Sequence, residues 1–140
     1  MSNPQKIVER MFDKDAFSQW LGIEIIKVND GYCKLKMIVR KEMLNGFHIT
    51  HGGISYSLAD TALAFASNTY GKKCMSIETS ISHANFVHEG DILVATTKEL
   101  SLTEKIGLYL ITITNQDKKD IAHFKGTVYR TSKGWFSEDE

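Results

Sequence analysis

The segment from His51 to Gly71 constrains the fold of this chain most, because it is the only long helical pattern in a sequence that otherwise favours strands. Asp60 is its one formal charge at neutral pH, and the surrounding helix is apolar or small on nearly every face: Ile54, Leu58, Ala59, Ala62, Leu63, Ala64, Phe65 and Ala66. Such a helix is expected to be buried. A buried lone carboxylate is costly unless it is paired or hydrogen-bonded. Asp60 is therefore either a core residue satisfied by a neighbouring hydroxyl or amide, or a functional residue.

Length and charge narrow the class of protein. The chain has 140 residues with 17 basic and 17 acidic side chains, so its formal net charge is zero. We expect one domain over residues 1–140, and neither nucleic acid nor an anionic membrane as a partner. No run approaches the roughly twenty apolar residues that cross a bilayer. Cys33 and Cys74 lie in apolar strand patterns without metal-ligand spacing, which favours free thiols in a reducing, cytoplasmic compartment.

Helix signals mark the start and the middle of the chain. Asn3 precedes a proline, Asp15 can cap a second short helical stretch and Gly22 can end it, so helical structure is expected over about 4–21. The central helix is expected over about 52–70.

Alternating apolar patterns predict about six strands. They are expected at 23–28, 32–39, 74–86, 92–102, 106–114 and 120–131, followed by a partly ordered tail over about 132–140. Short connections between the later strands favour antiparallel pairing. The expected fold is therefore α+β, with a curved antiparallel sheet wrapped around one long central helix.

The start of the central helix can bind an anion. Backbone N–H groups of Gly52 and Gly53 have no partner inside the helix and lie at its positive dipole end, and glycine leaves them open to a ligand. The alternative is that two glycines only permit a tight turn or close packing. Asp60 follows Gly52 by eight residues, which separates the two backbones by roughly 12 Å along a helix. If both groups act on one carbonyl, they must come from different chains, and the site requires a dimer.

Other reaction classes lack their sequence motifs. The chain has no GxSxG elbow, no glycine-rich phosphate loop and no HExxH zinc helix. His48 and His51 have no further ligand at metal spacing, so neither a metal nor another cofactor is expected. The isolated residues His83, His88 and His123 are interpreted as structural or surface histidines.

A family resemblance extends over nearly the whole chain. The stretch MLNGFHITHGGISYSLADTALAFASNTYG resembles the signature of the hotdog-fold acyl-CoA thioesterases, most closely the phenylacetate-degradation (PaaI-type) members. The segments DKDAFSQWLGIEII, GDIL and IAHFKGTVYR are also similar to that family. The resemblance implies the hotdog fold and a homotetramer built from two dimers, with sites at the dimer interface.

The resemblance also implies roles for individual residues. Asp60 would be the nucleophile or the general base, and the Gly52 N–H would polarise the thioester carbonyl. His51 and Asn45 would border the acyl group and orient it or the water. The remaining substrate-binding candidates are Gly53, from the helix start, and Ser76, which matches a water-holding serine of some relatives.

The expected reaction is hydrolysis of phenylacetyl-CoA, hydroxyphenylacetyl-CoA or a related short or aromatic acyl-CoA, with coenzyme A as part of the substrate. The alternatives are a hotdog enoyl-CoA hydratase or dehydratase, and a non-catalytic acyl-CoA-binding module. Aromatic residues that could line the acyl pocket are Phe47, Tyr56, Phe65 and Tyr70. Asn85 and Phe86 replace an Arg-Pro pair of many relatives, so the coenzyme A phosphates lack an assigned partner. Other cations that could serve are Lys72, Lys73, Arg130 and Lys133.

Overall fold

The computed structural model describes residues 3–136. Its helices are α1 (Pro4–Asp13), α2 (Ala16–Leu21) and α3 (Gly52–Asn68), with a short 3-10 helix at Lys41–Met43. Its strands are β1 (Glu24–Asn29), β2 (Tyr32–Ile38), β3 (Lys72–His83), β4 (Ile92–Leu102), β5 (Ile106–Thr114) and β6 (Asp120–Gly134). The order of elements agrees with the expectation from the sequence.

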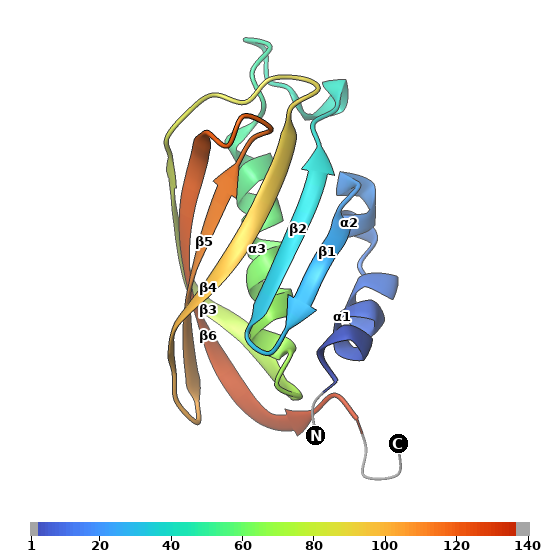
Figure 1. The fold of residues 1–140 in the computed structure, drawn as a ribbon, viewed down its shortest axis with the longest axis vertical. Helices are drawn as coiled ribbons and strands as arrows, with labels where there is room; N and C mark the ends of the chain where they lie inside the picture. The colour runs from blue at the N-terminus through green and yellow to red at the C-terminus, as the bar shows by residue number, and fades with distance from the viewer. Residues whose placement is uncertain (1–2, 137–140) are drawn as a thin grey trace.

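The strands form one antiparallel sheet in the order β1-β2-β4-β5-β6-β3, and the sheet curves around α3 (Figure 1). The predicted α+β architecture is therefore confirmed. The sheet has two edges, β1 and β3. The helices α1 and α2 lie beside the β1 edge, whereas β3 follows directly after α3 and is the other edge.

The central helix packs its apolar side into the sheet. Leu58, Ala62 and Ala66 are fully buried, and Gly126 of β6 lets the helix approach closely. A Cβ at Gly126 would overlap the methyl groups of Leu63. One stripe of α3 is nevertheless only partly buried, namely Tyr56, Ser57, Asp60 and Ala64. The helix is therefore less enclosed within one chain than its composition suggests.

Local signals at the N-terminus act as predicted. The Asn3 side chain accepts a hydrogen bond from Lys6 N at 3.2 Å and caps α1. Asp15 caps α2 by accepting from Ser18 N at 3.0 Å, and Gly22 ends α2 in the left-handed conformation at φ 76°.

The boundaries differ from the prediction near β3 and β6. Helix α3 ends at Asn68, and β3 covers Lys72–His83 rather than 74–86. β6 continues to Gly134, beyond the predicted end at residue 131, because its last residues pair with the start of β3. Trp135 then donates from Nε1 to Asn68 Oδ1 at 2.8 Å, so the start of the expected tail is ordered. The rest of that tail, 137–140, lies outside the described residues.

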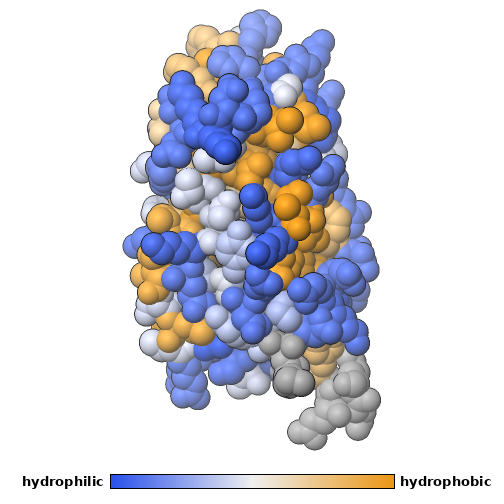
Figure 2. Space-filling model, in the orientation of Figure 1, coloured by the Kyte–Doolittle hydropathy of each residue, from blue (hydrophilic) through white to orange (hydrophobic). Residues whose placement is uncertain are grey.

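The surface of the molecule carries both hydrophilic and apolar side chains. The face viewed in Figure 1 is mostly hydrophilic with separate apolar patches (Figure 2). Within residues 3–136, no helix has the length and apolar character needed to span a membrane.

Cys33 and Cys74 are free thiols, as predicted. Burial raises the pKa of Cys33 to about 12, so this thiol is unsuited to act as a nucleophile.

Candidate functional site

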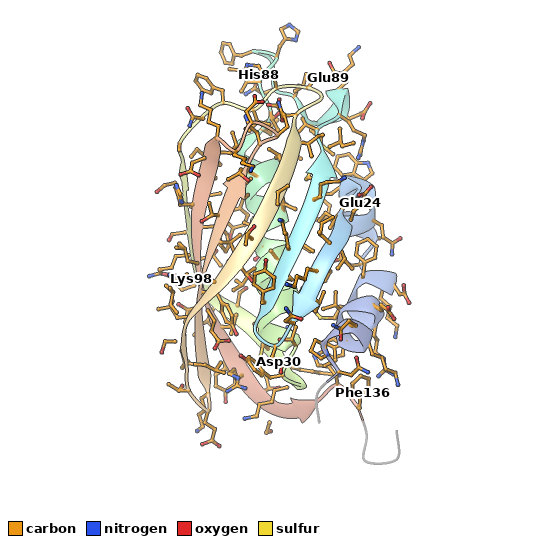
Figure 3. All side chains as sticks on the ribbon, in the orientation of Figure 1. Glu24, Asp30, His88, Glu89, Lys98 and Phe136 are labelled. Carbon is orange, nitrogen blue, oxygen red and sulfur yellow. The ribbon has the colours of Figure 1, made fainter. Side chains whose placement is uncertain are left out.

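A pocket of about 390 Å³ opens where α3 begins, between the loop that precedes the helix and the loop that follows β3. His88 and Glu89 mark this end of the molecule, whereas Asp30 and Phe136 lie toward the opposite end (Figure 3). The aromatic rings of Phe47 and Phe86 are 84% and 73% exposed. The pocket is lined by Asn45, Phe47, Ile49, Thr50, Gly52, Ser55, His83, Asn85, Phe86 and Val87.

Backbone hydrogen bonds hold the loop before α3 in place. Asn45 Oδ1 accepts from Phe47 N at 2.8 Å and from Ile49 N at 3.2 Å, which fixes a tight turn. Thr50 N donates to Val87 O at 2.9 Å and joins the two loops. Asn45 therefore has a structural role through its side-chain amide oxygen, and it also lines the pocket. Its role beside the acyl group stays a prediction.

Thr50 carries an unsatisfied polar group in this wall. Its side chain is 7% exposed, and its Oγ1 has no hydrogen-bond partner in the described part of the chain. Buried hydroxyl groups normally find a partner, so this atom is an exception that the sequence did not indicate.

The first turn of α3 has free N–H groups, and its first residue, Gly52, lines the pocket. Ile54 N donates to His51 O at 3.0 Å, but no acceptor within residues 3–136 meets the N–H groups of Gly52 and Gly53. These donors lie at the positive end of a helix of 17 residues. His51 is the N-cap residue, yet its exposed side chain makes no capping hydrogen bond. The predicted anion-binding helix start is therefore available for a carbonyl oxygen.

The two glycines have different surroundings. A Cβ at Gly52 would lie 3.0 Å from His83 Nε2, whereas a Cβ at Gly53 would meet nothing within 4 Å. His83 was interpreted from the sequence as an isolated structural or surface residue. It is exposed, as a surface residue is, but its ring also lines the pocket beside Gly52, which the sequence did not indicate. The sequence separates the two residues by 31 positions, so only the register of β3 against α3 could reveal the contact.

Asp60 lies farther along α3 and is half-buried. Its carboxylate has no hydrogen-bond or ion-pair partner among residues 3–136, so the interpretation of Asp60 as a satisfied core residue does not hold within one chain. Burial, and to a smaller extent the negative charge of Asp15, raise the pKa of Asp60 above its ordinary value. A half-buried, unpartnered carboxylate with a raised pKa is typical of a functional site.

The stripe that contains Gly52, Tyr56 and Asp60 runs along β3, because residues four apart share one helix face. Gly52 contacts His83, and the Tyr56 hydroxyl hydrogen-bonds the Thr79 hydroxyl, so helix and strand run in opposite directions. The next position on the helix stripe is Asp60.

Ser76 is the next residue of β3 that faces the helix. Cross-strand neighbours share a face of the sheet, and Ser76 pairs with Val128, whose side chain is 2% exposed in the core. Ser76 therefore lies on the same side of the sheet as Asp60, as its predicted role requires. The structure thus contains two candidate site regions, the pocket at Gly52 and the surroundings of Asp60. They lie roughly 12 Å apart along α3.

Two predicted aromatic pocket residues lie elsewhere. Phe65 is 1% exposed and packs edge-on against Phe12 in the core. Tyr70 donates to Glu99 Oε2 at 2.8 Å beyond the far end of α3. Phe47 does line the pocket, and Tyr56 lies between the two parts of the site.

Three of the four predicted phosphate-binding cations have partners near the far end of α3. Lys73 stacks on the Trp135 ring at 5.1 Å, and Lys72 Nζ donates to Glu104 O at 3.4 Å. Arg130 lies over the Tyr70 ring at 5.5 Å. The pocket at Gly52 is not lined by any of these side chains.

Comparisons with known proteins converge on one family. The model of the thioesterase superfamily matches residues 47–122. Acyl-coenzyme A thioesterase PaaI of Escherichia coli is 38% identical over 120 residues, which are 86% of each chain. A putative esterase of Archaeoglobus fulgidus is 41% identical over 129 residues, 92% of this chain and 84% of that protein. The structure of the E. coli PaaI protein from the phenylacetic acid degradation operon matches with a TM-score of 0.91 at 34% identity, covering 94% of this chain and 95% of that chain. The hotdog arrangement is confirmed by this likeness.

Proposed function

Because the chain belongs to the thioesterase superfamily and is a thioester hydrolase, we propose that its substrate is phenylacetyl-CoA, hydroxyphenylacetyl-CoA or a related short or aromatic acyl-CoA. The observation that carries the proposal is the unpartnered, half-buried Asp60 on the same helix as the free N–H groups of Gly52 and Gly53. The E. coli relative is named an acyl-coenzyme A thioesterase, which supports this substrate class.

The chemistry needs a polarised carbonyl and an activated oxygen nucleophile. The Gly52 N–H donates to the thioester carbonyl oxygen and stabilises the negative charge that develops there. Asp60 either takes a proton from the attacking water or attacks the carbonyl carbon itself and forms an anhydride that water then cleaves. In both routes the C–S bond breaks, the thiolate of coenzyme A leaves and takes up a proton, and the free acid is released. Neither route calls for a cofactor.

A second copy of this chain completes the site in this proposal. β3 is an edge strand of 12 residues, and its side chains Met75 and Ile77 are 64% and 60% exposed. Long exposed edge strands readily pair with another chain. Antiparallel pairing of two β3 strands sets the two α3 helices antiparallel, so that Asp60 of one protomer approaches Gly52 of the other. We propose such a dimer, and a homotetramer made of two dimers.

The pocket suits an acyl group with an aromatic ring. Phe47, Phe86, Ile49 and Val87 supply apolar walls, and the free donors of the first turn fix the carbonyl. Breakdown of aromatic acids such as phenylacetate is the metabolic setting that we propose for this reaction.

An assay of thiol release over aromatic, short-chain and long-chain acyl-CoAs tests the proposal. We expect the highest kcat/KM for the aromatic or short substrates, and loss of turnover in Asp60→Asn with the oligomer intact. Tight binding without thiol release would instead indicate an acyl-CoA-binding module. Hydration of an enoyl-CoA without thiol release would indicate a hydratase.

A further inference from the structure

His83 lies against the first turn of α3. Its cross-strand partner Ala122 is fully buried, so His83 points to the helix side of the sheet at the end of β3. A Cβ at Gly52 would lie 3.0 Å from Nε2 and 3.2 Å from Cε1 of His83. Both distances are shorter than ordinary contacts, so the missing side chain of Gly52 makes room for the imidazole ring.

The ring is free to bind a ligand. Neither nitrogen of His83 has a hydrogen-bond or ion-pair partner within residues 3–136, although the ring lines the pocket. An imidazole carries at least one N–H donor in either protonation state. Gly52, whose N–H group also lacks an acceptor within residues 3–136, lies beside it. Unpaired donors from a strand end and a helix start therefore converge on one wall of the pocket.

We propose that His83 donates a hydrogen bond from Nε2 to the same thioester carbonyl oxygen that receives the Gly52 N–H. This inference rests on the proposed function, because it assigns a second donor to that reaction. When the nucleophile adds to the carbonyl carbon, the C=O electron pair moves to oxygen, and both donors stabilise the resulting oxyanion. When the C–S bond breaks, the C=O bond re-forms and the thiolate leaves. His83 keeps its proton throughout, so its role is electrostatic.

The geometry explains why this role falls to His83. Among the other histidines, His51 presents an exposed side chain that makes no capping contact, and His123 pairs with Asp120 at 3.5 Å on β6. His83 alone among the five histidines lines the pocket. A donor in contact with Gly52 adds to the positive end of α3 and costs no rearrangement during the reaction.

Steady-state kinetics of His83→Ala and His83→Gln test the proposal with phenylacetyl-CoA, acetyl-CoA and octanoyl-CoA. Loss of one oxyanion donor lowers kcat by about 10²-fold, so we expect this loss in His83→Ala with little change in KM. Glutamine keeps an N–H donor on a side chain of similar reach, so His83→Gln should recover most of kcat. Because every substrate has the same carbonyl, the loss should be similar for all acyl chains that the wild type hydrolyses.

His123→Ala is the matched control, because it removes an imidazole outside the pocket and should keep wild-type kinetics. Circular dichroism and chromatographic mass of each variant check the fold and the oligomer. A wild-type kcat in His83→Ala overturns the inference alone. A loss confined to one acyl class also overturns it, because His83 would then only shape the acyl pocket. A wild type that hydrolyses none of the three thioesters overturns the proposed function as well.

Discussion

Two inactive variants should restore activity when they share one oligomer. Gly52 and Asp60 lie on one helix, and eight residues at about 1.5 Å each separate them by roughly 12 Å. A carboxyl group on a single methylene cannot span that distance to act on a carbonyl held at Gly52. Each site in the proposed dimer therefore takes its helix start from one chain and its carboxylate from the other.

Asp60→Asn and Gly52→Val chains are combined in one population of oligomers. Asp60→Asn removes the proposed nucleophile or base. Gly52→Val puts a side chain against His83, where the proposed carbonyl site lies. Each variant alone should be inactive. With equal amounts and random assembly, about one site in four combines an intact helix start with an intact carboxylate, and in an isolated mixed dimer about one site in two does. About a quarter to a half of wild-type activity should therefore return.

The assay is thiol release after co-expression with two different tags, followed by two affinity steps that isolate mixed oligomers. Mixing the two purified variants without subunit exchange is the control, and it should remain inactive. If mixed oligomers of confirmed composition release no thiol while a mixture of wild type and Asp60→Asn does, the site does not draw on two chains. Gly52 and Asp60 would then act within one chain or on different steps.

Three further changes test the energetics of the site and the core. Asp60→Asn should raise the melting temperature at pH 7. Burial raises the pKa of Asp60 in the folded state, so the wild type loses stability as the pH rises through that pKa. Near pH 3 the carboxyl group is protonated, and the gain in melting temperature should vanish. Gly126→Ala should lower the free energy of unfolding, measured by urea titration, by about 1–3 kcal/mol, because the new Cβ would overlap the buried side chain of Leu63. Gly46→Ala is the control: a Cβ there would meet nothing within 4 Å, so the free energy of unfolding should change little. Thr50→Val should keep or raise stability by about 1 kcal/mol because it removes an unsatisfied buried hydroxyl; marked destabilisation would show that Oγ1 has a partner.

Local chemistry made much of the fold predictable. Asn3, Asp15 and Gly22 cap or end helices through contacts within a few residues, and each contact forms as expected. The candidate site could be inferred where one residue broke a local rule, as Asp60 does in an otherwise uncharged helix; its catalytic role stays a prediction. The end of β6 could not be predicted in this way, because its last residues are ordered by β3 and the Trp135 contact with α3, which are distant in sequence.

The faces of β3 show why the rest of the site needs the structure. From His83 and Thr79, which face the helix, strict alternation would place Ile77 on the helix side and Ser76 on the outer face. The register shifts between Ser76 and Glu78, however, so Ile77 is the extra residue of a bulge, and Ser76 turns to the side of Asp60. The same strand thus places His83 beside Gly52 at one end and Ser76 toward Asp60 farther along. A bulge in the edge strand β3 therefore determines which of its side chains face α3 and the candidate site.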